Sequence, residues 1–118
     1  ILVVTLLATA ALAWAVMPKP APISDSADTR SQVNALAAQK ILTQHCTNCH
    51  SSRPTDEVFT TAPMGVMLDT IEQMQQWAPL IKAHTVDSMD MPLLNKTGMT
   101  PAERATLGEW IDAGAPAN

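Results

Sequence analysis

The segment Cys46-Thr47-Asn48-Cys49-His50 holds both cysteines of the chain and constrains it more than any other feature. Two cysteines separated by two residues and followed at once by histidine form the attachment pattern for a c-type haem. This spacing lets both thiols add across the two vinyl groups on one edge of the ring, and the next residue then lies under the iron. We therefore expect one covalent haem c, attached at Cys46 and Cys49, with His50 as its proximal iron ligand.

Three other uses of the two cysteines explain the pattern less well. A thioredoxin-type redox pair follows a strand, whereas this motif follows a predicted helix. Zinc requires four ligands, and the candidates besides the cysteines are His45, His50 and His84, of which the first two crowd against the thiols. A disulfide across two residues is strained and stabilises little.

A low-spin electron carrier needs a second axial ligand, which has to come from a segment well after the motif. Met91 is the best candidate because it precedes Pro92, which biases it towards an extended backbone that can present the thioether at a defined angle. Met89, Met99 and His84 are alternatives, and an open distal site would instead indicate a haem sensor or peroxidase. Three methionines nearer the motif are expected to fill core gaps, as methionine more often does: Met64, Met67 and Met74.

Helical signals dominate the rest of the chain, and no segment shows a strand pattern. Residues 31–44 are expected to be helical because apolar residues follow helical spacing there. Its predicted apolar face comprises Val33, Leu36, Ala37 and Ile41. His45, at the end of this helix, is expected to be an ordinary helix-end residue that meets the dipole. Residues 51–68 lack periodicity and are expected to form a loop with a short turn.

Further helices are expected beyond this loop. Thr70 and Gln73 form a capping box that opens a helix at Ile71. Pro79 starts a second helix that reaches Val86, unless one kinked helix spans 71–86.

Residues 87–99 form a second loop, in which Asn95 is expected to make a hydrogen bond. The last helix starts at Pro101, has a capping box of Thr100 and Glu103, and ends at Gly114. Trp110 is expected to pack this helix against the first one.

The N-terminal part divides into two segments of different composition. Residues 1–17 carry no charge and would reach about 25 Å as a helix, slightly short of the roughly 30 Å hydrocarbon core. We expect a membrane helix there, either a last span or a single anchor, with a signal peptide cleaved near Ala11-Leu12-Ala13 or a soluble apolar helix as alternatives. Residues 18–30 are expected to be a Pro-rich tether, and residues 31–118 the haem domain.

Composition limits the partners. The formal charge is −4, and the basic residues are scattered singly, so nucleic acid binding is not expected. The chain has no tyrosine and a single phenylalanine, so a large apolar cofactor would supply part of a core that roughly 90 residues can hardly build alone.

The order helix, CxxCH, loop, helix, Met-Pro, helix resembles a class I cytochrome c domain across residues 31–116. Two segments are more specific: APMGVMLDTIEQ at 62–73 and MPLLNKTGMTPAERATLGEWIDAGAP at 91–116. They resemble the C-terminal cytochrome c domain of membrane-bound bacterial urate oxidase (urate hydroxylase). That resemblance implies thioether links at Cys46 and Cys49, proximal His50 and distal Met91.

The resemblance also implies a setting. Electrons would come from urate oxidation in a membrane domain of the same or an associated protein and leave to a respiratory cytochrome or oxidase. The cytochrome domain would face the periplasm at the bacterial inner membrane. The chain itself carries no catalytic site, and the expected alternative is a free-standing membrane-anchored carrier serving other dehydrogenases or oxidases. Trp77-Ala78-Pro79 departs from the family pattern by interrupting the middle helix.

Overall fold

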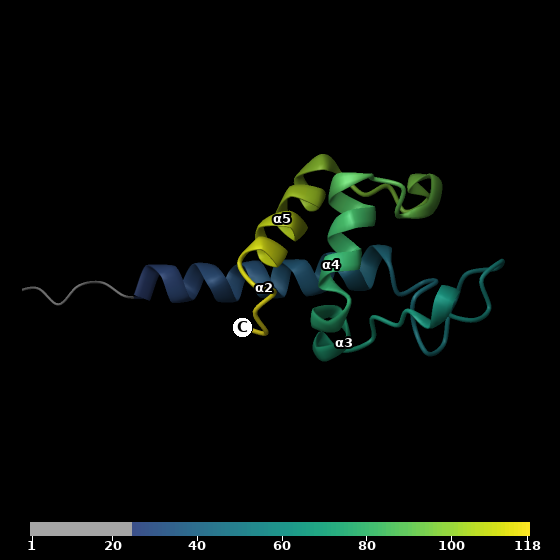
Figure 1. Ribbon diagram of the computed structural model, residues 1–118, viewed down its shortest axis with the longest axis horizontal. Coiled ribbons are helices and arrows are strands. Elements are labelled where there is room, and N and C mark those ends of the chain that lie inside the picture. Colours follow the sequence, from purple (N-terminus) through teal and green to yellow (C-terminus); the bar gives the residue numbers. More distant parts are fainter. Residues whose placement is uncertain (1–24) are drawn as a thin grey trace, which may run out of the picture.

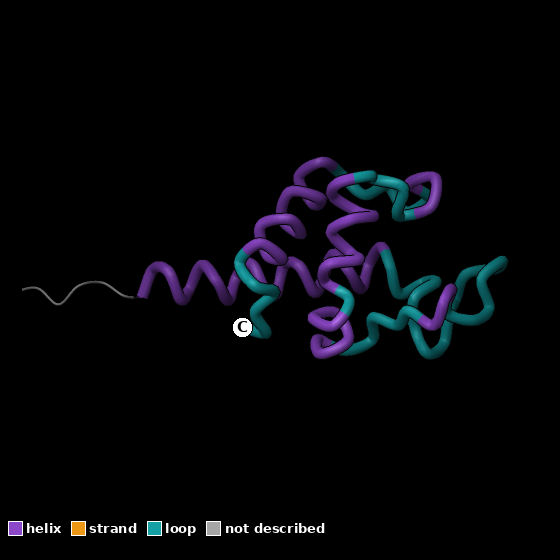
Figure 2. Tube along the Cα trace, in the orientation of Figure 1, coloured by secondary structure: helices purple, strands orange, loops and turns teal. Residues whose placement is uncertain are grey.

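One long helix, α2 (Asp25–His45), organises the fold, and the later helices lie beside its C-terminal half, some in contact with it and the others packed on those (Figure 1). The computed structural model describes residues 25–118, and within this range the protein is all-α, as expected, with no strand (Figure 2). The remaining elements are α3 (Ile71–Gln76), α4 (Ala78–Ile81), the π-helical segment η2 (Lys82–Asp87) and α5 (Pro101–Asp112), with two 3-10 turns, η1 (Pro63–Gly65) and η3 (Leu93–Asn95).

Helix α2 begins earlier than the sequence pattern predicts. It starts at Asp25 instead of Ser31, so residues 25–30 of the expected tether are helical. Asp28 lies near its N-terminus, where the helix dipole favours acidic side chains. The expected membrane helix at 1–17 lies outside the described residues. From residue 25 to residue 118, no helix is both long and apolar enough to cross a membrane.

The buried face of α2 differs from the predicted one. Ala35, Ala38, Ile41 and Leu42 are buried, whereas Leu36 is 68% exposed. The prediction for Leu36 was therefore wrong, and that for Ile41 was right. The error has a physical cause: alanine contributes little to a hydrophobic pattern, yet its small side chain lets a second helix approach closely.

That second helix is α5, which lies beside α2 in Figure 1. Trp110, Leu42 and Leu107 are the largest completely buried side chains, which confirms the expected core role of Trp110. The Trp110 indole N–H also donates to the Pro116 carbonyl (2.9 Å) and holds the C-terminal residues against the helix. Gly114, with φ of 95°, follows the last turn of α5 as predicted.

Both predicted capping boxes are present, with reciprocal bonds between Thr70 and Gln73 and between Thr100 and Glu103. Trp77 separates α3 from α4, and Pro79 lies in the first turn of α4. The middle region therefore holds two helices and not one kinked helix, since proline is accommodated in a first turn, where its missing N–H costs nothing.

Truncation of Leu107 tests whether the contact between α2 and α5 dominates stability. We expect Leu107→Ala to lower the free energy of unfolding by about 2–5 kcal/mol, because it leaves a cavity at a fully buried position. Leu36→Ala, which truncates an exposed leucine of α2, should change it by less than about 0.5 kcal/mol. Urea unfolding followed by circular dichroism measures both. Equal losses of the free energy of unfolding in the two variants would show that the contact between α2 and α5 does not dominate stability.

Candidate functional site

The end of α2 places the cysteine motif. The Cys46 N–H donates to the Leu42 carbonyl (2.9 Å) and so prolongs the helical pattern to the motif itself. The chain then turns back, because the N–H groups of Cys49 (3.2 Å) and His50 (2.7 Å) both donate to the Cys46 carbonyl. This turn brings both cysteines and His50 to the wall of one hollow region.

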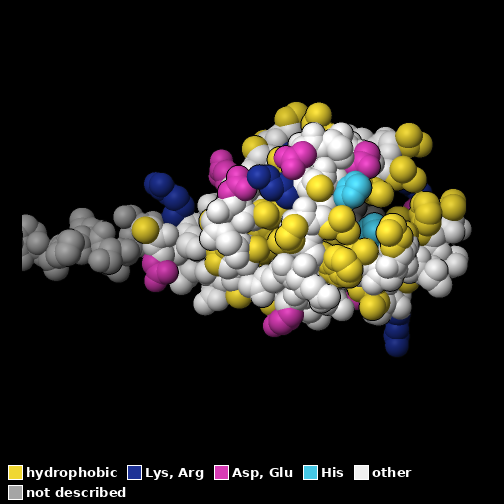
Figure 3. Space-filling model, viewed as in Figure 1, with side chains coloured by type: hydrophobic (Ala, Val, Ile, Leu, Met, Phe, Trp, Pro, Cys, Tyr) yellow, Lys and Arg dark blue, Asp and Glu magenta, His cyan; other side chains and the backbone are white. Residues whose placement is uncertain are grey.

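The hollow region consists of two adjoining cavities, of about 170 Å³ and about 680 Å³. Four residues border both: Cys46, His50, Pro63 and Met91. The walls are mainly apolar, and Figure 3 shows histidine side chains set among hydrophobic ones on the face that it draws. The larger volume lies within the roughly 300–1,000 Å³ range of small-molecule and cofactor sites.

His50 is oriented by the loop that follows it. Its Nδ1–H donates to the Val66 carbonyl (3.0 Å), and its own carbonyl accepts from the Leu68 N–H (2.9 Å). With the proton on Nδ1, Nε2 carries the free lone pair that a metal ligand needs. A hydrogen bond from Nδ1–H to a backbone carbonyl, here that of Val66, is the usual way in which proteins orient a metal-binding histidine.

Met91 is held through its backbone. Its N–H donates to the His84 carbonyl (3.0 Å), and its carbonyl accepts from Arg104 Nη1 (2.7 Å). Met91 thus faces the same two cavities as His50, although the two residues come from segments far apart in the sequence.

None of the alternative distal residues borders both cavities. Met99 is buried in the core at 3% exposure and borders neither cavity. Met89 is 59% exposed and also borders neither. His84 borders the smaller cavity, and its Nδ1 lies 3.0 Å from the Asp90 carboxylate. Of the four candidates, Met91 alone shares both cavities with His50.

The electrostatics of the two thiols bear on the competing uses of the motif. Burial, with a smaller effect of Cys49, raises the pKa of Cys46 to about 12. Burial and the Asp56 carboxylate raise the pKa of Cys49, against a lowering effect of Lys96. Redox-active cysteines need a lowered pKa, so these two pKa shifts do not support the hypothesis of a thioredoxin-type redox pair.

The hypotheses of a zinc site and of a disulfide are not supported either. Across the described range, no three or more histidine, cysteine or acidic side chains converge on one point as metal ligands would. Both cysteines are free.

The residues present meet the requirements of a c-type haem. Two protonated thiols, an imidazole with a free Nε2 and a thioether surround an apolar hollow. These are the donor types that hold a haem covalently and ligate its iron from two sides.

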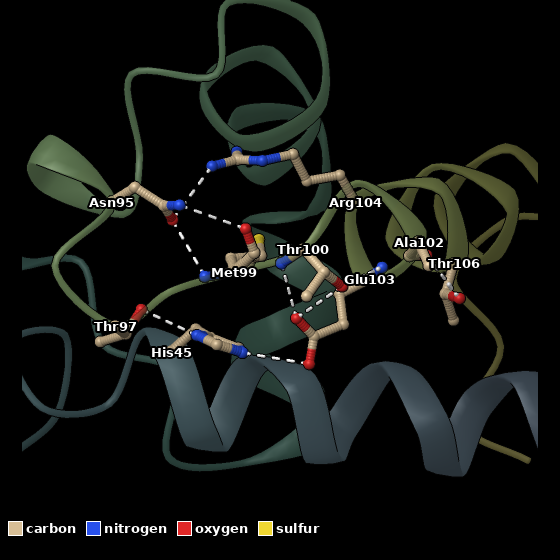
Figure 4. A network of polar contacts seen from close by, with 9 residues as sticks. All are labelled: His45, Asn95, Thr97, Met99, Thr100, Ala102, Glu103, Arg104 and Thr106. Atoms are coloured by element: carbon tan, nitrogen blue, oxygen red, sulfur yellow. Dashed lines mark hydrogen bonds and ion pairs between the residues drawn. The ribbon is translucent and has the colours of Figure 1, made fainter.

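His45 has a larger structural role than the sequence suggests. It is 4% exposed, its Nε2 donates to Glu103 (3.2 Å), and its Nδ1 lies 2.7 Å from the Thr97 hydroxyl (Figure 4). The expected position at the end of the helix is confirmed, whereas the burial and these two partners were not predicted. Its partners lie far along the chain, and no local signal could have identified them. The Thr100 backbone N–H, together with His45, holds the pKa of Glu103 below its ordinary value.

Two loops meet at the rim of the larger cavity. Asp56 accepts hydrogen bonds from the backbone N–H groups of Val58 (2.9 Å) and Phe59 (3.1 Å) and forms an ion pair with Lys96 (2.6 Å). The Lys96 ammonium, with these N–H groups, holds the pKa of Asp56 well below its ordinary value. The ion pair joins the loop after the cysteine motif to the loop after Met91.

The loop turns also carry exposed apolar residues. Met64 in η1 and Leu94 in η3 both have φ of 55° and are 96% and 93% exposed. Met64 borders the smaller cavity and Leu94 the larger one. The expectation that Met64 fills the core was therefore wrong, whereas Met74 is buried at 3% exposure as predicted. Such left-handed positions cost a non-glycine residue about 1–2 kcal/mol.

Asn95, in the same loop as Met91, makes the hydrogen bond that was predicted there. Its side chain accepts from the Met99 N–H (2.9 Å) and donates to the Met99 carbonyl (3.2 Å), as Figure 4 shows. These two bonds close the loop that leads from Met91 to α5.

Comparison with known proteins adds no relative: no family model, no curated protein and no solved structure matches the chain.

The depressed pKa of Asp56 predicts a pH-dependent contribution to stability. Because the folded-state pKa lies below the ordinary 3.8, the carboxylate stabilises the fold above that pH, and this contribution is lost as the pH falls below it. We expect Asp56→Asn to lower the free energy of unfolding at pH 7, and its difference from the wild type to shrink below about pH 4. Urea unfolding at several pH values measures this difference.

Glu57→Gln is the matched control for Asp56. It removes a negative charge from the neighbouring position and leaves the bonds of Asp56 to Val58, Phe59 and Lys96 in place. A loss as large as that of Asp56→Asn, with the same pH dependence, would contradict the role assigned to Asp56.

Proposed function

We propose that residues 31–118 form a one-electron carrier built around one covalent haem c. The observation that carries this proposal is the placement of Cys46, His50 and Met91 on the walls of the same two apolar cavities. A bound haem supplies the Fe(III)/Fe(II) couple.

Each residue has a distinct task in this proposal. Cys46 and Cys49 hold the group through thioether bonds, which prevents its loss from a small domain. His50 offers Nε2 as the proximal ligand, since its Nδ1–H is engaged by Val66. Met91 offers its thioether from the distal side, and histidine–methionine ligation raises the reduction potential relative to two histidines. The mainly apolar walls offer the ring an apolar surface.

We further propose that this carrier serves a membrane-bound urate oxidase in the bacterial inner membrane, on the periplasmic side. Support comes from the sequence segments at 62–73 and 91–116, which resemble the cytochrome domain of that family. Electrons from urate oxidation in a membrane domain would enter this domain and leave to a respiratory cytochrome or oxidase. No residue of this chain is assigned a part in urate chemistry.

Replacement of Met91 tests the assignment of the distal ligand. We expect Met91→Ala to retain covalent haem, seen by haem staining after denaturing electrophoresis, because both cysteines remain. It should abolish the weak far-red absorption band that a methionine sulfur on ferric haem produces, and it should lower the reduction potential.

Met89→Ala is the matched control, since it removes a methionine two positions away that borders neither cavity. It should leave the band intact. Loss of the band in Met89→Ala and not in Met91→Ala would refute the ligand assignment. A wild-type protein that matures in the periplasm without covalent haem would refute the proposed function itself.

The proposed donor is tested with membranes that contain the native, full-length protein. Urate should reduce its haem, seen as the sharpening of the visible absorption bands of a ferrous c-type haem, and an equal concentration of allantoin should not. A haem that is reduced by other respiratory substrates and not by urate would favour a free-standing carrier.

A further inference from the structure

Arg104, in the first turns of α5, makes an unusual set of contacts. Its Nη1 donates to two backbone carbonyls, that of Thr85 (2.6 Å) and that of Met91 (2.7 Å). Its Nη2 lies 3.4 Å from Asn95 Oδ1, the contact drawn in Figure 4. The guanidinium therefore connects three segments: the end of η2, Met91 and the turn after Met91 that contains Asn95. Arg104 itself borders neither cavity.

One of these contacts satisfies a carbonyl group that a helix end leaves free, that of Thr85. Thr85 lies in η2 and is buried at 3% exposure, and the last carbonyls of a helix have no partner within it. The His84 carbonyl accepts from Met91 directly, and the Thr85 carbonyl is connected to Met91 through Arg104. A cation at this position also suits the negative end of the helix dipole.

Arg104 is itself firmly placed. It follows Glu103, whose capping box with Thr100 fixes the start of α5, and α5 packs on α2. Helix α2 ends at the cysteine motif. Arg104 and α5 therefore connect the backbone of Met91 to α2, the helix that leads directly into Cys46.

We propose that Arg104 is a positioning residue for the distal side of the site. It holds the backbone of Met91 so that the thioether stays at the cavities shared with His50. This inference rests on the proposed function, because Met91 matters as a ligand only if a haem is held.

The chemistry of arginine explains why a simple cation would not serve. The planar guanidinium directs several N–H groups in fixed directions, so one side chain spans two carbonyls and an amide oxygen. A lysine ammonium is a point donor on a flexible stem, and we expect it to hold one of these acceptors at a time.

The test uses the whole chain with its haem attached and measures how tightly added imidazole binds to the oxidised protein. Imidazole competes with Met91 for the distal position, so its affinity rises when Met91 is held less firmly. We expect Arg104→Gln to raise this affinity at least about tenfold, since a hydrogen bond from a charged donor is lost. Arg104→Lys should give a smaller increase, and hydrogen exchange at residues 88–95 should accelerate in the same order.

Leu107→Ala separates positioning from general stability. It weakens α5 at a buried core residue that borders neither cavity. Its imidazole affinity should stay within about twofold of the wild type even though it unfolds at lower urea. If Arg104→Gln fails to fold, Arg104→Lys is compared with the wild type instead. An imidazole affinity of Arg104→Lys within twofold of the wild type would then overturn the inference.

Two results would overturn the inference. One is an imidazole affinity within twofold of the wild type in the Arg104 variants. The other is an increase in Leu107→Ala as large as that in Arg104→Gln. Either result leaves the proposed function standing, provided that the wild type carries covalent haem and shows the far-red band. Absence of haem from the wild type would refute the proposed function instead.

Discussion

The packing of α5 against α2 is the constraint on which the rest of the structure depends. Trp110, Leu42 and Leu107 are buried completely between these helices, and Ala35 and Ala38 let the backbones approach. Burial of a large apolar side chain contributes about 1.5–3 kcal/mol, so this contact accounts for much of what so small a domain can gain. Because α2 ends in the cysteine motif and α5 follows the loop that carries Met91, the same contact places both walls of the candidate site.

Polar contacts of α5 then fix the positions of individual residues that the packing of α5 on α2 brings near each other. On one side, Glu103 accepts from the buried His45 at the end of α2. On the other side, its neighbour Arg104 binds the carbonyl of Met91. Two consecutive residues of α5 therefore contact two residues that border the larger cavity, His45 and Met91. Buried or half-buried polar groups of this kind cost free energy if they lack partners, so each contact makes its partner's position specific.

Much of the local structure could be predicted from the sequence, because it depends on neighbours in the chain. The capping boxes at Thr70 and Thr100 and the placement of Pro79 in a first turn follow from hydrogen bonds and backbone angles within a few residues. The buried face of α2 was mispredicted at Leu36, since the true face uses alanines whose burial depends on a helix far along the chain. The roles of His45 and Arg104 could not be predicted for the same reason.

By itself, the sequence determined the all-α class, the donor atoms that are available and the spacing of Cys46, Cys49 and His50. These are properties of residue types and of short separations along the chain. Only the tertiary structure decided that Met91, and not Met89 or Met99, lies with His50 at both cavities, and that Arg104 holds it there. That choice depends on how α5 packs against α2 and η2, which is set by contacts between segments distant in sequence and is not encoded in any local pattern.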